Sequence, residues 1–405
     1  MGQSTFPVPS SGSSTSTILP VNASSVILDG SLTTAGTYTT TVNGNGGIAY
    51  LTATDNPATI TISGTAYSVP ANTVVATTAV VGSGVSATVA ANLIAPATFT
   101  ASTMPSSRNW YGVTYGNGYF VAVAQSNSSP YTTTAGAYST NGTTWTASTM
   151  PSSSEWWGVT YGNGYFVAVA LSTTAAAYST NGTTWTASTM PSSRNWWGVT
   201  YGNGYFVAVA QSTTAAAYST NGTTWTASTM PSSSNWYNVT YGNGYYVAVA
   251  YSTTSGAYST NGTTWTASFM PSSSGWSGVA YGLIGATPTY VAVANGTSAG
   301  AYSTNGTTWT ASTMPSNAGW WGVTYGNGYF VSVQDSAPNG AYSTNGITWT
   351  ANTISTINVG WWGVTWGNNY FVAVASPSTT AGAYFAELPA LPVNFGIYSG
   401  PTTIN

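Results

Sequence analysis

The sequence predicts an all-β fold made of repeated antiparallel units, and three observations support this prediction. First, a unit reading W-x-G-V-T-Y-G-N-G-Y-F-V-A-V-A occurs seven times with small changes between copies. Its copies begin at Trp110, Trp156, Trp196, Trp236, Trp276, Trp320 and Trp361, at steps of 40 to 46 residues. Second, Asn-Gly dipeptides separate short apolar segments, and Asn-Gly is a strong signal for a hairpin turn. Third, the segment Y-F-V-A-V-A is apolar on both faces, as in a strand covered by neighbouring sheets.

Each copy is expected to hold four strands. In the second copy they are placed at residues 156–161, 165–170, 175–179 and 183–187. The first two are linked by Gly162-Asn163-Gly164 and the last two by Asn181-Gly182. A period near 40 residues with several short strands is typical of a β-propeller blade or of one coil of a β-solenoid.

The two ends of the array favour the propeller. Residues 97–106 repeat the fourth strand and its exit, but the first three strands do not precede them. The last copy has three strands, ending with residues 381–386, and no fourth follows. The N-terminal strand is therefore predicted to complete the last blade, which removes an exposed sheet edge. The predicted fold is a seven-bladed β-propeller closed by an N-terminal strand and preceded by a small β-sandwich or barrel domain.

Four segments are expected along the chain. Residues 1–20 are rich in Ser, Thr, Pro and Gly, which predicts an extended N-terminal arm. In residues 21–96 short β-prone runs alternate with turn signals, which predicts a small β-rich anchoring domain. Residues 97–386 form the predicted propeller, and residues 387–405 form a C-terminal tail. Strand direction places the anchoring domain and the tail on the side of the Asn-Gly turns.

Composition limits the function. Charged residues make up 2% of the 405 residues, and the chain has no Lys, His or Cys. Nucleic-acid binding is not expected, because phosphate contacts need a basic surface, and no apolar run reaches the about 20 residues of a membrane span. Histidine and cysteine catalysis are impossible and acids are few, so we expect no enzyme, no cofactor and no metal site. Low net charge favours association, which predicts a homo-oligomer or a multi-copy assembly.

Paired aromatic residues are the first candidates for ligand binding. Six copies begin with such a pair, and the remaining copy begins with Trp276-Ser277. The pairs are Trp110-Tyr111, Trp156-Trp157, Trp196-Trp197, Trp236-Tyr237, Trp320-Trp321 and Trp361-Trp362. Successive strand residues point to opposite faces, so one ring of each pair can pack while the other leans toward the loops. Aromatic rings stack on the apolar faces of sugars, which predicts a glycan site. The alternative is that both rings fill gaps between blades.

The few charges in the repeats form a second group of candidates. Arg108, Glu155 and Arg194 lie one or two residues before the first Trp of their copies. Asp335 lies in a loop on the same predicted face. Varied loops on a repeated scaffold are where binding groups usually gather, so Arg108, Glu155 and Arg194 join the candidate site. The alternative is that polar loops acquired these charges without any function.

A second recurring string, A-Y-S-T-N-G-T-T-W-T, resembles the Asp-box hairpin of sialidase-like propellers, whose pattern is roughly Ser-x-Asp-x-Gly-x-Thr-Trp. Asparagine stands where the family has Asp, and one residue is missing before the Gly-Thr-Trp part. These asparagines are Asn141, Asn181, Asn221, Asn261, Asn305 and Asn345. The resemblance covers residues 97–386 and implies a propeller in which the box lies away from the catalytic face of that family.

These features together predict a non-enzymatic structural protein of a virus particle: a tail fibre, an adhesin or a capsid-decorating protein. The composition and domain order are similar in style to tailed-phage structural proteins. Residues 1–96 would bind other virion or surface-assembly proteins, while the propeller presents a face to host-surface glycans or another receptor. The expected location is the extracellular virion, with a cell-surface or other extracellular location as the alternative. Two other functions remain open: a purely architectural subunit without receptor contact, and a free bacterial propeller lectin.

Overall fold

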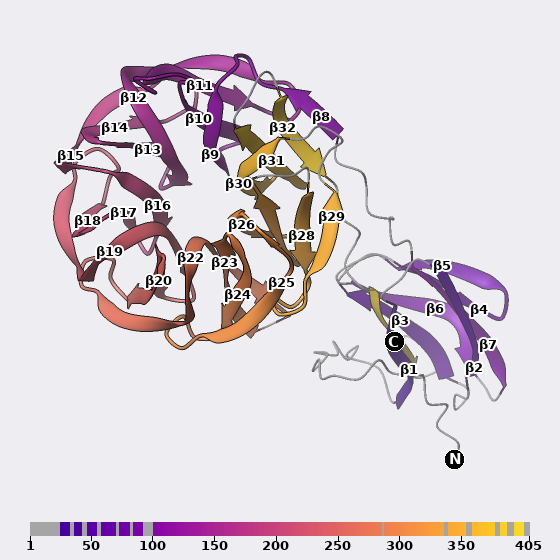
Figure 1. Cartoon of the computed structure of the whole chain (residues 1–405). Coiled ribbons are helices and arrows are strands. Elements are labelled where there is room, and N and C mark those ends of the chain that lie inside the picture. Colours follow the sequence, from indigo (N-terminus) through magenta and orange to yellow (C-terminus); the bar gives the residue numbers. More distant parts are fainter. Residues whose placement is uncertain are drawn as a thin grey trace. The chain divides into compact units, whose positions relative to one another are not determined.

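The structure is a computed structural model, and it describes residues 25–32, 36–42, 47–54, 58–69, 73–81, 84–91, 100–285, 287–335, 339–353, 359–376, 381–386 and 393–400. All regular elements among these residues are β-strands, as predicted, so no helix of this part of the chain could cross a membrane. The chain divides into two compact units (Figure 1). The small unit comprises Met1–Pro96 with Pro389–Asn405, and the ring unit comprises Ala97–Leu388. The predicted arm at residues 1–20 lies outside the described residues.

The small unit contains two four-stranded antiparallel sheets. One has the order β1 (Ser25–Leu32), β33 (Val393–Gly400), β3 (Gly47–Thr54) and β6 (Thr73–Val81). The other has the order β2 (Gly36–Val42), β7 (Val85–Ala91), β4 (Ala58–Ile62) and β5 (Thr65–Val69). Strand β33 lies between β1 and β3 and pairs with both. The segment expected to be a separate C-terminal tail thus contributes an inner strand to this unit.

The ring unit consists of four-stranded antiparallel meanders that follow one another around a ring (Figure 1). The first four contain β9 (Asn109–Gly116), β10 (Tyr119–Gln125), β11 (Thr133–Ser139), β12 (Thr146–Gly162), β13 (Tyr165–Leu171), β14 (Thr173–Ser179), β15 (Thr186–Arg194), β16 (Trp196–Gly202), β17 (Tyr205–Ala210), β18 (Thr213–Ser219), β19 (Thr226–Gly242), β20 (Tyr245–Tyr251), β21 (Thr253–Ser259) and β22 (Thr266–Ile284). The later meanders contain β23 (Thr287–Asn295), β24 (Thr297–Ser303), β25 (Thr310–Ala318), β26 (Trp320–Gly326), β27 (Tyr329–Gln334), β28 (Asn339–Ser343), β29 (Thr350–Thr353), β30 (Gly360–Gly367), β31 (Tyr370–Ser376), β32 (Ala381–Ala386) and β8 (Thr100–Thr103).

Three long strands each serve two meanders. Strand β12 pairs with β11 through its N-terminal part and with β13 through its C-terminal part. Strands β19 and β22 do the same for the meanders that follow. The long strand carries the chain from the outer edge of one meander to the inner edge of the next, so each meander begins near the ring axis.

The first and last meanders meet, because the N-terminal strand β8 pairs antiparallel with β32. Thr100 lies opposite Phe385, and Thr103 lies opposite Ala381. On the inner side, a Cβ added to Gly367 would lie 2.0 Å from Cγ of Tyr115, so the last meander packs directly on the first. Only glycine allows this close approach of a tyrosine ring to the neighbouring backbone.

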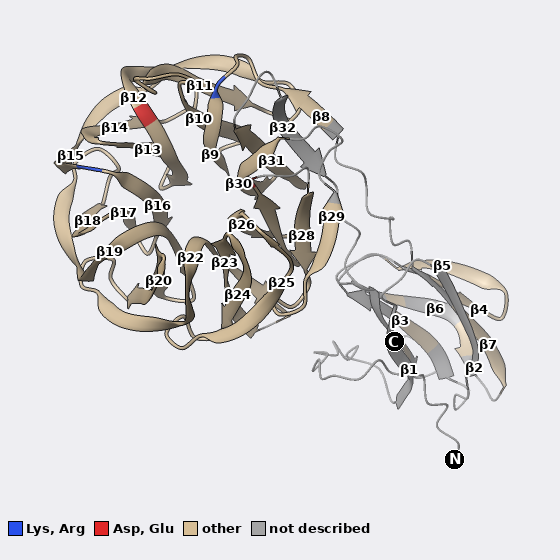
Figure 2. Ribbon diagram, viewed as in Figure 1, with Lys and Arg blue, Asp and Glu red and all other residues tan. Residues whose placement is uncertain are grey.

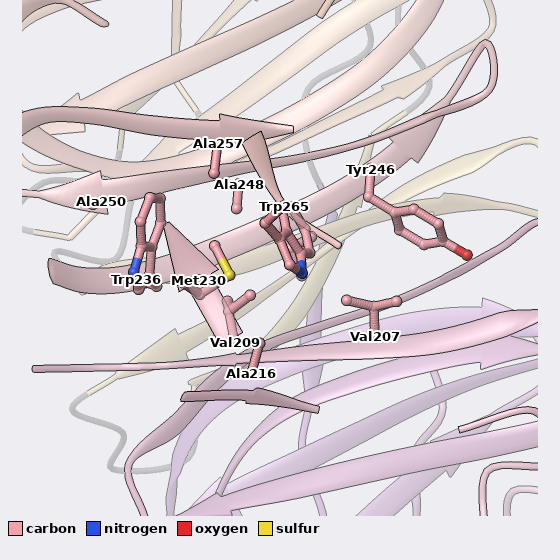
Figure 3. Packing of buried hydrophobic residues seen from close by; sticks show 11 residues of the cluster. Val207, Val209, Ala216, Met230, Trp236, Tyr246, Ala248, Ala250, Ala257 and Trp265 are labelled. Carbon is pink, nitrogen blue, oxygen red and sulfur yellow. The ribbon is translucent and has the colours of Figure 1, made fainter. Parts of the chain in front are cut away.

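The core lies between meanders, as Figure 3 shows for one interface. Val207 and Val209 of β17 face Trp236 of β19 and Tyr246 of β20, and Met230 fills the space between them. Trp236, Tyr246 and both valines are completely buried. Strands such as β17 are apolar on both faces because a neighbouring sheet covers each face.

The hairpin turns explain why Asn and Gly recur. Asn163 and Gly164 between β12 and β13 have φ values of 47° and 81°. Positive φ is favourable for Gly and tolerated by Asn, which makes this pair suited to tight turns. In the next hairpin, the Asn181 Oδ1 atom accepts hydrogen bonds from the backbone N–H groups of Thr183 and Thr184, at 3.0 and 2.9 Å.

Candidate functional site

The first ring of each aromatic pair is buried between meanders. These rings, together with Trp276, have exposed fractions of 0 or 1% and are Trp110, Trp156, Trp196, Trp236, Trp320 and Trp361. Where a bond of the indole Nε1–H is resolved, it goes to the carbonyl of a serine four residues earlier, as from Trp156 to Ser152 at 3.2 Å. A ligand cannot reach these rings, so for them the packing interpretation holds and they are not part of the site built below.

The second ring of each pair lies at the centre of the ring unit. These half-buried side chains, together with Ser277, line a cavity of about 200 Å³. They are Tyr111, Trp157, Trp197, Tyr237, Trp321 and Trp362. Because the lining comes from the first strand of every meander, the cavity lies on the ring axis. We call this set of seven residues the channel mouth.

The rings of the channel mouth stack on one another. Tyr111 and Trp157 have ring centroids 3.9 Å apart, and Trp197 and Tyr237 have centroids 4.1 Å apart, both nearly parallel. Trp321 and Trp362 form a third such pair at 4.1 Å. Much of each ring face is therefore covered by a neighbouring ring, and a ligand in the cavity would meet mainly ring edges and indole or phenol polar atoms. The predicted arrangement, with free ring faces leaning toward the loops, is not what these pairs adopt.

One sector departs from this pattern. Ser277 replaces the second ring in its copy and is buried. The ring of Tyr251, which comes from the end of β20, lies in this sector instead, stacked 4.7 Å from Tyr237 and 6.2 Å from Trp321. Tyr251 thus fills the space that the missing aromatic residue leaves.

Glycine keeps the channel narrow. A Cβ on Gly112 would lie 2.3 Å from the carbonyl oxygen of Trp157 on the next inner strand. The corresponding glycine is replaced only in one copy, by Asn238, whose Nδ2 donates to the carbonyl of Ser277 at 3.4 Å. Neighbouring inner strands therefore approach each other closely. The aromatic side chains of the channel mouth fill part of the space that is left around the ring axis.

A belt of variable side chains, all polar except Leu171, lies at the mouth end of the strands, and we call it the polar belt. It is formed by one position, at the end of the second strand of each copy, which differs almost every time: Gln125, Leu171, Gln211, Tyr251, Asn295, Asp335 and Ser376. Trp197 Nε1 donates to Gln211 Oε1 at 3.0 Å, and Trp321 Nε1 donates to Asp335 Oδ2 at 2.6 Å. Asp335 also accepts from Asn295 Nδ2 at 3.3 Å.

Apart from Asp335, which was placed on this face, the sequence analysis did not identify the polar belt. The signal is present in the sequence, since this position varies while its neighbours Y-F-V-A-V-A hardly change. An alignment of the copies on one another would have found it.

The three predicted charged residues each lie one or two residues before the first Trp of a copy, but in different surroundings. Figure 2 marks Lys and Arg in blue and Asp and Glu in red. Arg108 is half-buried and bonded within the chain, with Nε donating to Thr133 Oγ1 at 3.3 Å and Nη1 to the Ser107 carbonyl at 2.8 Å. Glu155 on β12 is half-buried and accepts from Gln125 Nε2 at 3.3 Å. Burial raises the pKa of the Glu155 carboxyl above its usual value. Arg194, the last residue of β15, is exposed.

Arg194 borders a second cavity beside the channel mouth. This cleft has a volume of about 380 Å³. Its lining residues are all polar: Ser172, Ser193, Arg194, Asn195, Gln211, Ser212 and Thr213. Gln211 belongs to both features, because its side chain lines the cleft and accepts the indole hydrogen bond of Trp197.

The tyrosines of the mouth remain neutral over a wide pH range. Burial raises the pKa of Tyr237 to about 12, with a smaller contribution from Tyr251. Burial also raises the pKa of Tyr111, although a hydrogen bond from Ser376 opposes the shift. The phenol groups therefore serve as neutral hydrogen-bonding groups. No group of three or more acidic, His or Cys residues suited to a metal ion occurs in the part of the chain that the structure describes.

Comparison with known proteins identifies the fold. No protein-family model and no curated protein matches the sequence. Among solved structures, a streptogramin B lyase has a TM-score of 0.61 at 13% identity over 75% of this chain and 98% of its own. A virginiamycin B lyase from Staphylococcus aureus, in a catalytically inactive form with quinupristin, has a TM-score of 0.62 at 13% identity over 71% and 98%. YCF48 from Cyanidioschyzon merolae has a TM-score of 0.54 at 14% identity over 72% and 98%. These are β-propeller-like proteins, so the prediction of a β-propeller is confirmed.

The same comparison corrects one expectation. The expectation from composition that this chain is not an enzyme is wrong as an argument, because chains with a similar fold include lyases. At 13% identity the likeness concerns the fold alone and assigns no lyase activity to this chain.

Proposed function

We propose that this chain is a structural protein of a virus particle, such as a tail fibre, an adhesin or a capsid-decorating protein, whose propeller binds a host-surface carbohydrate at the channel mouth. One observation carries this proposal. Most copies are nearly identical at their turns, apart from the longer segment 282–288 and Asn368-Asn369, whereas the residues at the opposite end, around the aromatic rings and the polar belt, differ between most copies. Variation concentrated at one end of a repeated scaffold is the usual signature of a binding surface.

The proposed fold of the ring unit is a seven-bladed propeller that the N-terminal strand closes. In support, each copy of the repeat corresponds to one four-stranded meander, and β8 supplies the fourth strand of the last one. We further propose that the two sheets of the small unit form a β-sandwich, and that the Ser-Asn-Gly turns are a variant of the Asp-box hairpin.

Cavity size limits what the channel mouth holds. Its volume of about 200 Å³ is below the roughly 300–1,000 Å³ of sites for drug-sized ligands. A single sugar ring at the end of a longer glycan is of a suitable size. Ring edges, the phenol group of Tyr237 and the side chain of Asn238 would contact its C–H groups and hydroxyls.

The direction of the strands supports display of this face. Strand β8 enters the ring beside Phe385, near the C-terminal end of β32. Both chain connections of the ring unit therefore lie at the turn end of the strands, away from the channel mouth. A net charge of only −3 favours packing into an assembly, in which residues 1–96 would form the anchor.

The proposal is tested by binding of the full chain to an array of bacterial-surface mono- and oligosaccharides. We expect at least one sugar class to bind, and we expect Trp157→Ser to weaken that binding about tenfold, because serine removes the ring but occurs naturally at this position in another copy, as Ser277. Ile347→Thr is the matched control, since it restores the common residue at the turn end and should leave binding unchanged.

Four results would count against the proposal. The carbohydrate site would be ruled out if no sugar binds, or if Trp157→Ser binds like the original chain while its circular dichroism shows intact folding. Imaging the particle with the channel mouth buried against a neighbour would favour a purely architectural subunit. Recovery of the protein only from culture supernatant, and not from purified particles, would favour a free lectin.

A further inference from the structure

We propose that the polar cleft beside the channel mouth binds the carboxylate of an acidic sugar through Arg194 and Gln211. This inference rests on the proposed carbohydrate-binding function and specifies its ligand class. The cleft volume of about 380 Å³ falls within the range of small-molecule sites. Its lining includes a guanidinium group and two side-chain amides but no carboxylate.

Hydrogen bonds fix which atoms the cleft offers. Gln211 Oε1 accepts from Trp197 Nε1 at 3.0 Å and from Asn195 Nδ2 at 3.2 Å. Asn195 Oδ1 in turn accepts from the backbone N–H and the hydroxyl of Ser172, both at 2.9 Å. The amide oxygens are thus used within the chain, whereas the Gln211 Nε2 group keeps its hydrogens for another acceptor. The cleft is therefore rich in donors.

Another copy of the repeat shows what such a glutamine binds. Gln125 occupies the position equivalent to Gln211, after the same Y-F-V-A-V-A segment. Its Nε2 donates to the carboxylate of Glu155, which precedes the first Trp of the next copy, at 3.3 Å. Where Gln211 would find that carboxylate, the next copy has Asn235. A carboxylate supplied by a ligand would restore the same interaction.

Arg194 provides the complementary charge. It occupies the same repeat position as Arg108, whose guanidinium is bonded to Thr133 and Ser107. The Arg194 backbone pairs with Thr173 in the sheet, but within the described part of the chain its guanidinium group makes no hydrogen bond or ion pair, and the residue is exposed at the rim of the cleft. The planar guanidinium group matches a carboxylate with two parallel N–H···O bonds. Serine occupies this position in other copies, so the blade itself does not need an arginine.

The remaining lining favours a sugar over an acidic peptide. Four of the lining residues carry hydroxyl groups: Ser172, Ser193, Ser212 and Thr213. Hydroxyls match the hydroxyls of a sugar, whereas acidic peptide motifs are usually bound by clusters of arginines, and the cleft lining holds one arginine. Gln211 connects the cleft to Trp197 of the channel mouth, so one glycan could occupy both.

The test compares two oligosaccharides that differ only in their terminal residue, glucuronic acid or glucose, by titration calorimetry with the full chain. We expect the acidic form to bind about tenfold more tightly, because charge-assisted hydrogen bonds are stronger than neutral ones. Arg194→Ser should abolish this preference without changing binding of the neutral form. Arg108→Ser is the matched control: it removes the same charge at the equivalent position and should keep the preference.

Each contrary outcome has a distinct meaning. The inference is overturned if the chain does not prefer the acidic form, if Arg194→Ser keeps the preference, or if Arg108→Ser loses it equally. Tighter binding of a glutamate-rich peptide than of the acidic oligosaccharide would overturn the sugar assignment. If only neutral sugars bind and Trp157→Ser weakens them, the proposed function stands while the acidic-sugar inference fails.

Discussion

The two ends of the repeated strands differ in how much they vary, although the same chain segments form both. At the turn end, the Ser-Asn-Gly hydrogen bonds recur in six copies, with the Gly N–H 2.8 or 2.9 Å from the Ser Oγ each time. At the mouth end, the residue at the end of the second strand is Gln, Leu, Tyr, Asn, Asp or Ser. Residues that maintain the ring must repeat, because each blade meets an equivalent neighbour. Residues that would recognise the proposed ligand are free to differ.

Two adjacent tryptophans provide the strongest test of the difference between the blade interfaces and the mouth end. Trp156 is fully buried between blades, whereas Trp157 is half-buried at the channel mouth. We expect Trp156→Ala to lower the free energy of unfolding by about 3–5 kcal/mol, because it leaves a large cavity. Trp157→Ser should cost less than about 2 kcal/mol, since it loses mainly ring stacking. Denaturant unfolding of both variants measures the difference. Equal losses would show that the mouth is as structural as the blade interfaces.

Much of the fold could be predicted from the sequence because its signals are local and repeated. Asn163-Gly164 and Asn181-Gly182 determine hairpins that close within a few residues, and five copies have the first of these Asn-Gly turns while six have the second. The pairing of β33 with β1 and β3 could not be predicted, because residues 393–400 match no repeat and their partners are far away in the sequence.

The sector in which the ring of Tyr251 takes the place of the ring that Ser277 lacks offers a second, smaller test. We expect Ser277→Trp alone to cost about 1–3 kcal/mol, because the ring of Tyr251 already occupies that sector. Combining it with Tyr251→Gln, the residue that another copy has at this position, should recover most of the loss. A double-mutant cycle on the free energy of unfolding measures the coupling.

Tyr251→Gln alone serves as the control for this cycle and should be mildly destabilising. Additive effects of the two substitutions would contradict the conclusion that Tyr251 replaces a missing ring. The channel mouth would then tolerate aromatic residues at each position independently.

The candidate site could be predicted only in part. The alternation of side chains along a strand indicated that one ring of each pair is buried, which holds for Trp156 and its equivalents. It could not show that the second rings meet at one axis and stack, since this depends on the distance between the inner strands. That distance is set by close contacts such as Gly112 on Trp157, which sequence spacing does not reveal.

Titration of Glu155, at the mouth end, has the smallest expected effect on the free energy of unfolding. Burial raises the pKa of its carboxyl, so the folded state binds the proton more tightly than the unfolded state does. Its contribution to stability is therefore present below the ordinary pKa of about 4.3 and is lost as the pH rises through the raised value. Because solvent screens this half-buried group, the difference should be a few tenths of a kcal/mol.

Glu155→Gln removes the titration but keeps an acceptor for Gln125. We expect the variant to equal the original chain in acid and to be slightly more stable at neutral pH, as measured by the free energy of unfolding across that range. At each pH, the free energy of unfolding of the original chain minus that of the variant isolates the contribution of Glu155 from those of the other acidic residues. If the variant is instead less stable at neutral pH, the ionised carboxylate contributes more through its bond to Gln125 than it loses by burial. A ligand carboxylate beside Gln211, with Arg194 added, would then be bound more strongly than the present geometry predicts.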